Sequence, residues 1–157
     1  MSDGIDGLDR LAKRIAELAF DTRRVERPLH AIGVYMLGSV ERNFQAQGRP
    51  TRWTPLKPST LARRRKGPHQ GGPQILMDTG GLKHSIKEQV TLSGNSSVSI
   101  GSNKKYARRQ QMGYEGKTGK GAGRGHSPTP ARPFLLIQEE DKPKIIEIAR
   151  RCLEGKL

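Results

Sequence analysis

The amino-acid sequence predicts an α+β fold, in which N-terminal amphipathic helices pack on a small antiparallel sheet and a C-terminal helix completes the chain. Apolar residues recur at helical spacing within the first 44 residues and again near the C-terminus. Between residues 90 and 100 they instead alternate with polar residues, as in a half-buried strand. Apolar residues make up only 32% of the 157 residues, so we also expect long loops.

Three amphipathic helices are expected. The first has an apolar stripe from Ile5 to Leu18, and the second has one from Leu29 to Phe44. Pro28 suits the first position of the second helix, because that position leaves its N–H unpaired in any case. The last helix begins near Asp141, and its apolar side is expected to comprise Ile145, Ile146, Ala149 and Leu153.

The middle of the chain predicts a β-hairpin and several short helices. Val90 and Leu92 precede a turn at residues 93–95, and Val98 and Ile100 follow it, which gives the hairpin one apolar face. A two-stranded hairpin is rarely stable alone, so this face must pack on the helices or join other strands. Short helices are expected at residues 59–65, 82–87 and 104–112.

We expect a single domain over residues 1–157, with flexible loops at about residues 46–75 and 113–130. Five prolines between residues 50 and 73 prevent long regular elements. Six glycines between residues 113 and 125 leave little apolar surface to bury. Trp53 is expected to pack under the proline-rich loop, and the apolar run Phe134–Ile137 is expected to insert into the core.

The net charge of +14 is concentrated in the middle of the chain. Residues 42–134 carry eighteen basic and three acidic side chains, whereas the flanking segments are close to neutral. No acid occurs between residues 42 and 77, so this charge is expected to face solvent, DNA or an acidic partner. The candidate contact residues are Arg63, Arg64, Arg65, Lys66, Lys104, Lys105, Arg108, Arg109, Lys117, Lys120 and Arg124.

The sequence predicts no catalytic, metal or cofactor site. The glycine-rich segment has no Gly-Lys-Ser/Thr phosphate-binding signature, and three acids in the middle of the chain provide no carboxylate cluster for a nuclease. The longest purely apolar run has four residues, which is too short to cross a membrane. The histidines are widely separated in sequence, and no Cys–Cys or His–Cys pair has the spacing of metal ligands; these residues are His30, His69, His84, His126 and Cys152.

Several short motifs, taken in order, resemble the phage virion morphogenesis family. Residues 52–57 read Arg-Trp-Thr-Pro-Leu-Lys, residues 75–82 read Ile-Leu-Met-Asp-Thr-Gly-Gly-Leu, and residues 131–135 read Ala-Arg-Pro-Phe-Leu. The group that they resemble includes the tail completion protein of phage P2 and its phage Mu counterpart. Leu136 stands where that group typically has glycine. The motif residues are Trp53, Pro55, Leu56, Asp78, Thr79, Gly80, Leu82, Tyr106, Gly113, Arg132, Pro133 and Phe134.

The resemblance implies a non-enzymatic structural protein of the virion, without a cofactor, assembled in the cytoplasm of the bacterial host. Its role would be to complete the head-proximal end of the tail or to join tail to head. The implied partners are further copies in a ring, for example a hexamer, and other tail or head–tail connector proteins. The charge leaves an alternative open, namely a nucleic-acid-binding protein that contacts DNA without sequence preference.

Overall fold

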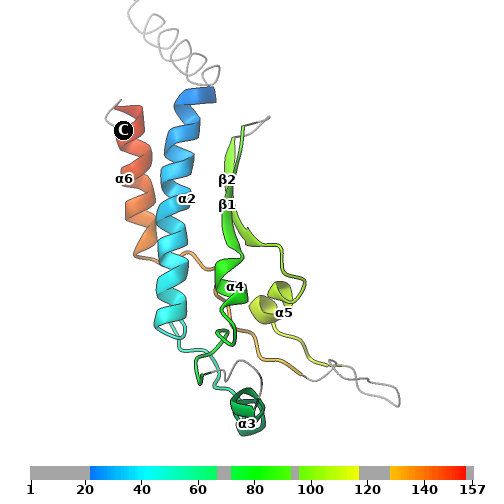
Figure 1. The fold of residues 1–157 in the computed structure, drawn as a ribbon. Helices are drawn as coiled ribbons and strands as arrows, with labels where there is room; N and C mark the ends of the chain where they lie inside the picture. Colours follow the sequence, from blue (N-terminus) through cyan, green and yellow to red (C-terminus); the bar gives the residue numbers. More distant parts are fainter. Residues whose placement is uncertain (1–21, 67–71, 93–95, 117–127, 155–157) are drawn as a thin grey trace, which may run out of the picture.

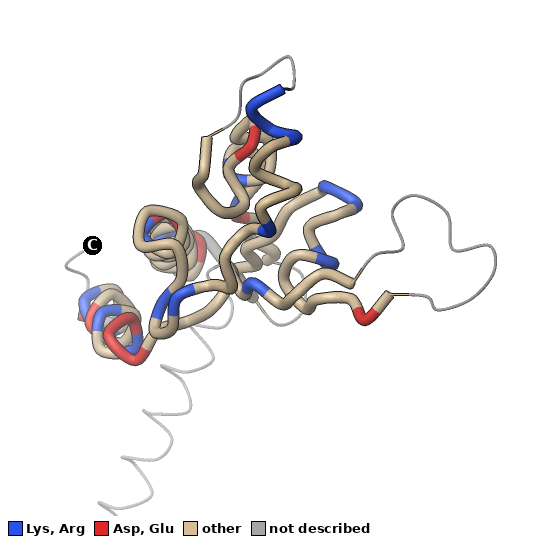
Figure 2. The backbone as a smooth tube through the Cα atoms, turned by 90° about the horizontal axis from the view of Figure 1, so that it is seen from below, with Lys and Arg blue, Asp and Glu red and all other residues tan. Residues whose placement is uncertain are grey.

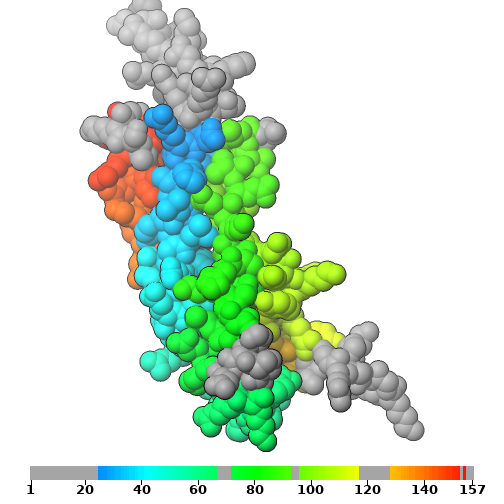
Figure 3. Space-filling model, in the orientation of Figure 1, coloured from blue at the N-terminus to red at the C-terminus, as the bar shows by residue number. Residues whose placement is uncertain are grey.

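The computed structural model describes residues 22–66, 72–92, 96–116 and 128–154. Helix α2 (Thr22–Gln45) runs along an elongated subunit, between α6 (Asp141–Leu153) and a hairpin formed by β1 (Ile86–Thr91) and β2 (Ser97–Ser102) (Figure 1). The space-filling view shows the same narrow, extended body (Figure 3). This arrangement confirms the α+β class, whereas the helix expected at residues 5–18 lies outside the described residues.

Three short helices lie toward the C-terminal end of α2: α3 (Pro58–Lys66), α4 (Gly81–His84) and α5 (Ala107–Met112) (Figure 1). Helix α3 confirms the short helix expected at residues 59–65. The helix expected at residues 82–87 ends earlier, because Ile86 already belongs to β1. Helix α5 begins three residues later than expected, because a turn comes first, in which the backbone N–H of Ala107 donates to the carbonyl of Lys104 at 2.9 Å.

Helix α2 begins six residues before Pro28, so the prediction that this proline starts the helix is wrong. Proline inside a helix removes one backbone hydrogen bond. Pro28 is nevertheless buried, and burial of its ring offsets part of that loss.

The core forms where the C-terminal half of α2 meets the loops that flank α3 and α6. The Phe44 ring lies 5.6 Å from the Trp53 ring in an edge-to-face arrangement and 5.7 Å from the Phe134 ring. Trp53 also donates its indole N–H to the carbonyl of Pro133 at 3.1 Å, so its predicted anchoring role is confirmed. The other buried apolar residues of this cluster are Val40, Ile75, Leu82 and Ala107.

Two predictions about apolar residues near the C-terminus are partly wrong. Only Phe134 of the run 134–137 is fully buried, and Ile137 is 57% exposed. Of the residues predicted on the apolar side of α6, Ile146 is 59% exposed and Ala149 is also exposed, whereas Ile145 is partly buried, as is Ile148. The apolar character of these residues therefore did not show whether they would be buried in the core or exposed to solvent.

The hairpin has the predicted alternation, although its turn lies outside the described residues. Its antiparallel register pairs Ile86 with Ser102 and Thr91 with Ser97. Partly buried residues of both strands share the face toward α2, and exposed polar residues share the other. The partner that a lone hairpin needs is therefore the helix α2.

Gly33 allows the hairpin to lie close to α2. A Cβ atom at this position would overlap Oε2 of Glu88 and would lie 3.1 Å from a methyl group of Val98. Oε1 of Glu88 lies 2.6 Å from Nδ1 of His30, which holds the carboxylate against α2. The second carboxylate oxygen, Oε2, is buried and has no described hydrogen-bond partner.

We predict that Gly33→Ala lowers the free energy of unfolding by about 1–2 kcal/mol, although alanine favours a helix by about 1 kcal/mol over glycine. The methyl group would expel the Glu88 carboxylate from its position against α2. Urea denaturation of Gly33→Ala, Glu88→Ala and the double variant measures the coupling. When Glu88→Ala is already present, the loss of unfolding free energy caused by Gly33→Ala should become smaller or turn into a gain. Stabilisation by Gly33→Ala alone would contradict this account.

Candidate functional site

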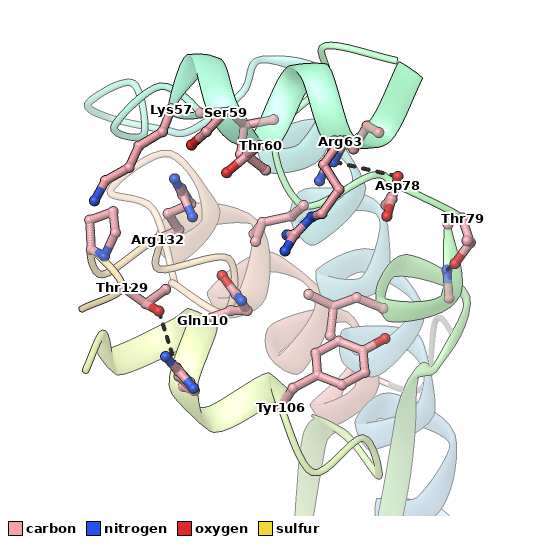
Figure 4. A pocket seen from close by; sticks show the side chains of 18 of the residues that line it. Lys57, Ser59, Thr60, Arg63, Asp78, Thr79, Tyr106, Gln110, Thr129 and Arg132 are labelled. Atoms are coloured by element: carbon pink, nitrogen blue, oxygen red, sulfur yellow. Dashed lines mark hydrogen bonds and ion pairs between the residues drawn. The ribbon is translucent and has the colours of Figure 1, made fainter. Parts of the chain in front are cut away.

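A groove opens at the end of the subunit where α3 faces α5 (Figure 4). It is lined by residues from the segments 56–64, 76–82, 106–110 and 128–132 and has a volume of about 680 Å³. We call it the α3–α5 groove. Helix α3 and the residues before it form one wall, and α5 with the 128–132 segment forms the opposite wall. Its volume falls within the range of about 300–1,000 Å³ that is typical of ligand sites.

The motif segments that are far apart in sequence converge on this groove. Trp53 and Phe134 belong to the core, together with Leu82, which also lines the groove. Pro133 accepts a hydrogen bond from Trp53, and Pro55 is exposed. Gly113 has a φ of 78°, and a Cβ atom there would lie 2.8 Å from the backbone nitrogen of Ala131. The motif residues that line the groove itself are Leu56, Asp78, Thr79, Gly80, Leu82, Tyr106 and Arg132.

Arg132 connects the 128–132 segment to the residues before α3 through hydrogen bonds. Its side chain is almost completely buried, with Nε and Nη2 each donating to the carbonyl of Thr54 at 3.1 Å. Nη2 also approaches the carbonyl of Pro55 at 3.4 Å. Burial, and then the positive charge of Arg64, lower the pKa of Arg132 below its usual value.

Arg64 has a structural role that the sequence did not predict. Its Nη1 donates to the carbonyls of Gly72 at 3.1 Å and Gln74 at 2.7 Å, and its Nε lies 3.4 Å from Oδ1 of Asp78. The expectation that no nearby acid balances this basic run is therefore wrong for Arg64. The arginine fastens the 72–78 segment to α3 and so shapes one wall of the groove.

The remaining cations of the groove differ in how firmly they are held. The Arg109 guanidinium lies 4.5 Å from the centre of the Tyr114 ring and donates to Thr129 Oγ1 at 3.1 Å. Arg63 and Lys57 are exposed, and neither side chain forms a hydrogen bond or ion pair with a described residue. Both extend from the α3 side of the groove in Figure 4. These two cations are therefore available to a ligand.

The predicted contact residues do not form one surface. Figure 2 shows that basic positions gather on α3 and around α5. Of the predicted set, the structure brings Arg63, Arg64 and Arg109 into the groove and adds Lys57 and Arg132. Lys104 lines a second concavity of about 780 Å³ beside the hairpin. The exposed Arg65, Lys66, Lys105 and Arg108 line neither concavity, and Lys117, Lys120 and Arg124 lie outside the described residues.

A buried carboxylate at the start of α6 was missed by the sequence analysis. Asp141 is fully buried and accepts hydrogen bonds from Ser39 Oγ at 2.7 Å, Tyr35 Oη at 3.0 Å and the backbone N–H of Gln138 at 2.9 Å. Arg42 adds a longer ion pair at 3.4 Å. Burial acts to raise the pKa of Asp141, but the hydrogen bonds and the Arg42 charge together hold it below its usual value.

Asn43 extends this polar cluster along α2. Its Nδ2 donates to the carbonyl of Phe134 at 3.0 Å, and its Oδ1 accepts from Arg49 Nε at 2.9 Å and from Gln138 Nε2 at 3.3 Å. Arg49 also pairs with Glu140. The cluster therefore fastens the segment before α6 and the start of α6 onto α2, so we assign it a structural role.

In the part of the chain that the structure describes, no group of three or more His, Cys, Asp or Glu side chains is placed to hold a metal ion. None of the helices in this part is long and apolar enough to cross a membrane.

The model of the phage virion morphogenesis family matches residues 5–154 of this chain. The chain belongs to this family. It is 31% identical over 143 residues to the Mu-like prophage FluMu G protein 2 of Haemophilus influenzae. The aligned region covers 91% of this chain and 88% of that protein. No solved structure matches. The predicted family resemblance is thus confirmed, and virion morphogenesis membership gives the chain a structural or assembly role in a phage particle.

Proposed function

We propose that this virion morphogenesis protein completes the head-proximal end of a phage tail, or joins the tail to the head, as a non-enzymatic subunit of a ring. The observation that carries this proposal is the convergence of the family motifs on the exposed α3–α5 groove. Two of the groove's arginines, Arg64 and Arg132, are bound to backbone carbonyls, so the groove is a preformed surface. A subunit of an assembly needs preformed surfaces of this kind for its neighbours.

The two ends of the subunit differ, which supports a ring. Helix α2 has 24 residues and is therefore about 36 Å long. The groove lies toward its C-terminal end, and the start of α2 lies at the opposite end, next to the C-terminal part of α6 (Figures 1 and 3). Contacts between unlike surfaces of identical subunits are heterologous and close into a ring when the rotation between copies closes. A hexamer is the ring that we expect.

A phage or prophage that lacks this gene should still make DNA-filled heads. Its tails should form, but they should fail to join heads or should have abnormal head-proximal ends. Electron microscopy of lysates would measure free heads, free tails and joined particles, and the wild-type gene supplied in trans should restore joining. Loss of heads with accumulation of normal tails would contradict the proposed function.

Contact with DNA is a second candidate function, favoured by the eighteen basic side chains between residues 42 and 134. The exposed cations outside the groove would suit contacts with phosphates, which depend on charge rather than on a concave shape. Such binding would be independent of DNA sequence. Its affinity would fall steeply with salt, with a logarithmic slope of about −0.9 for each phosphate neutralised.

A further inference from the structure

The charge of the α3–α5 groove is unbalanced. Five cationic side chains line it, whereas Asp78 is its one carboxylate among the described residues and is already paired with Arg64. Arg63 and Lys57 at the rim have no described ionic partner. Like charges gathered in one concavity repel each other, so an anionic occupant would stabilise the groove.

The groove also has an apolar component, which the phosphate backbone of duplex DNA would not contact. Leu56, Leu76 and Leu82 contribute to its lining, and Leu76 has a positive φ of 60°, an uncommon backbone conformation for leucine. Proteins place protruding helices or strands in the grooves of DNA, whereas this surface is concave. A peptide with carboxylates and apolar side chains complements both the cations and the leucines.

The chain itself contains a segment with this chemistry. Residues 1–9 read Met-Ser-Asp-Gly-Ile-Asp-Gly-Leu-Asp, with three aspartates, an isoleucine and a leucine but no basic side chain. The other acid-rich stretch, residues 139–141, is already engaged. Glu139 pairs with Lys142, Glu140 pairs with Arg49, and Asp141 is buried.

We propose that the α3–α5 groove of one subunit binds the acidic segment Met1–Asp9 of a neighbouring copy. The segment precedes α2, which begins at the end of the subunit remote from the groove (Figure 1). Because the segment and the groove are unlike surfaces, the contact that we propose joins copies head to tail, as in a heterologous interface. This inference rests on the proposed function, because it supplies the contact that closes the ring.

Peptide binding tests the contact directly. The probe is a synthetic peptide of residues 1–9, titrated by calorimetry into the full chain carrying Asp3→Asn, Asp6→Asn and Asp9→Asn, so that its own segment does not compete. We expect binding that weakens about tenfold or more when Lys57→Gln and Arg63→Gln are added, because each removes a charge that faces the peptide. Circular dichroism verifies folding, and neither side chain holds a described partner that the substitution would break.

The matched control is the pair Arg65→Gln and Lys66→Gln in the same receptor. It removes the same charge from the same end of the protein, but neither residue lines the groove. We expect affinity within about twofold of the unsubstituted receptor, since exposed charges that do not contact the peptide are screened by solvent and salt. Absence of peptide binding, or equal losses in the two pairs, would overturn the inference.

Oligomer mass, measured by light scattering, provides the second arm. The wild type and the Arg65→Gln, Lys66→Gln variant should form the ring. The aspartate variant and the Lys57→Gln, Arg63→Gln variant should not. A ring that persists without the three aspartates would refute this contact, whereas the proposed role at the tail end would still depend on the deletion phenotype.

Duplex DNA provides the third arm and separates the two polyanions. Because non-specific binding follows the number of phosphate contacts, we expect both charge pairs to weaken DNA binding to a similar degree. If DNA binding instead fell only in the Lys57→Gln, Arg63→Gln variant and the peptide did not bind, the groove would face DNA and the inference would be wrong.

Discussion

Replacement of Phe44 with alanine is expected to lower the free energy of unfolding by about 3–5 kcal/mol. Phe44 is fully buried and contacts the rings of Trp53 and Phe134, which come from two other segments of the chain. Its removal leaves a cavity whose walls belong to three separate segments, so collapse of one segment cannot fill it. Urea denaturation followed by circular dichroism would measure the loss.

Val34 provides a control on the same helix for the Phe44 prediction. It is 53% exposed, so Val34→Ala should change the free energy of unfolding by no more than about 0.5 kcal/mol. A cost below about 1 kcal/mol for Phe44→Ala would show that the ring cluster is not the core of this fold. The groove should be lost along with the core, because Leu82 belongs to both.

Asp141→Ala is expected to destabilise the protein by about 3 kcal/mol or more. The substitution leaves the hydroxyl groups of Ser39 and Tyr35 without their acceptor, and it removes the carboxylate partner of Arg42. A buried polar group without a partner costs more than the original hydrogen bond contributed. Chemical denaturation would measure the effect, and Ser39→Ala, which removes one donor, should cost less.

The same carboxylate makes stability depend on pH. The pKa of Asp141 is lower in the folded protein than the value of about 3.9 expected for an unfolded chain. The stabilisation is therefore fully present above about pH 4 and is lost as the pH falls through the lower folded pKa. Thermal denaturation between pH 3 and pH 7 should show this loss in the wild type.

Asp141→Asn should remove that part of the acid sensitivity. Glu139→Gln serves as the control, because the Glu139 side chain is 89% exposed. Removal of its charge should leave the loss of stability at low pH unchanged. Equal acid sensitivity in the wild type and Asp141→Asn would show that Asp141 is not held as a buried, hydrogen-bonded carboxylate.

The periodic elements could be predicted from the sequence because their signals are local. The apolar stripe of α2 and the alternation of the hairpin each depend on residues within a few positions of one another. Pro28 misled the prediction of the helix start, because a preference for the first turn does not exclude an interior position. Ile137 and Ile146 misled the core prediction, because an apolar side chain can also remain on the surface.

The candidate site could be predicted only in part. The motifs indicated residues such as Asp78 and Arg132, but nothing in their spacing showed that they line one groove. The role of Arg64 depends on backbone carbonyls eight and ten residues away, which no side-chain pattern encodes. The sequence analysis missed one pattern in α2, the polar residues Tyr35, Ser39 and Asn43. They are spaced four residues apart and so lie in a row beside the apolar stripe, where Ser39 and Asn43 are buried.

The α3–α5 groove exists only in a completely folded chain, because its walls come from four segments spread over about half of the sequence. A chain with an unfinished core would display the same basic residues but not their arrangement. In the contact that we propose, a neighbour that docks in the groove would therefore accept folded subunits and not unfolded ones. Incorporation into a particle would act as a proofreading step, in which defective copies are left out because they offer nothing to bind.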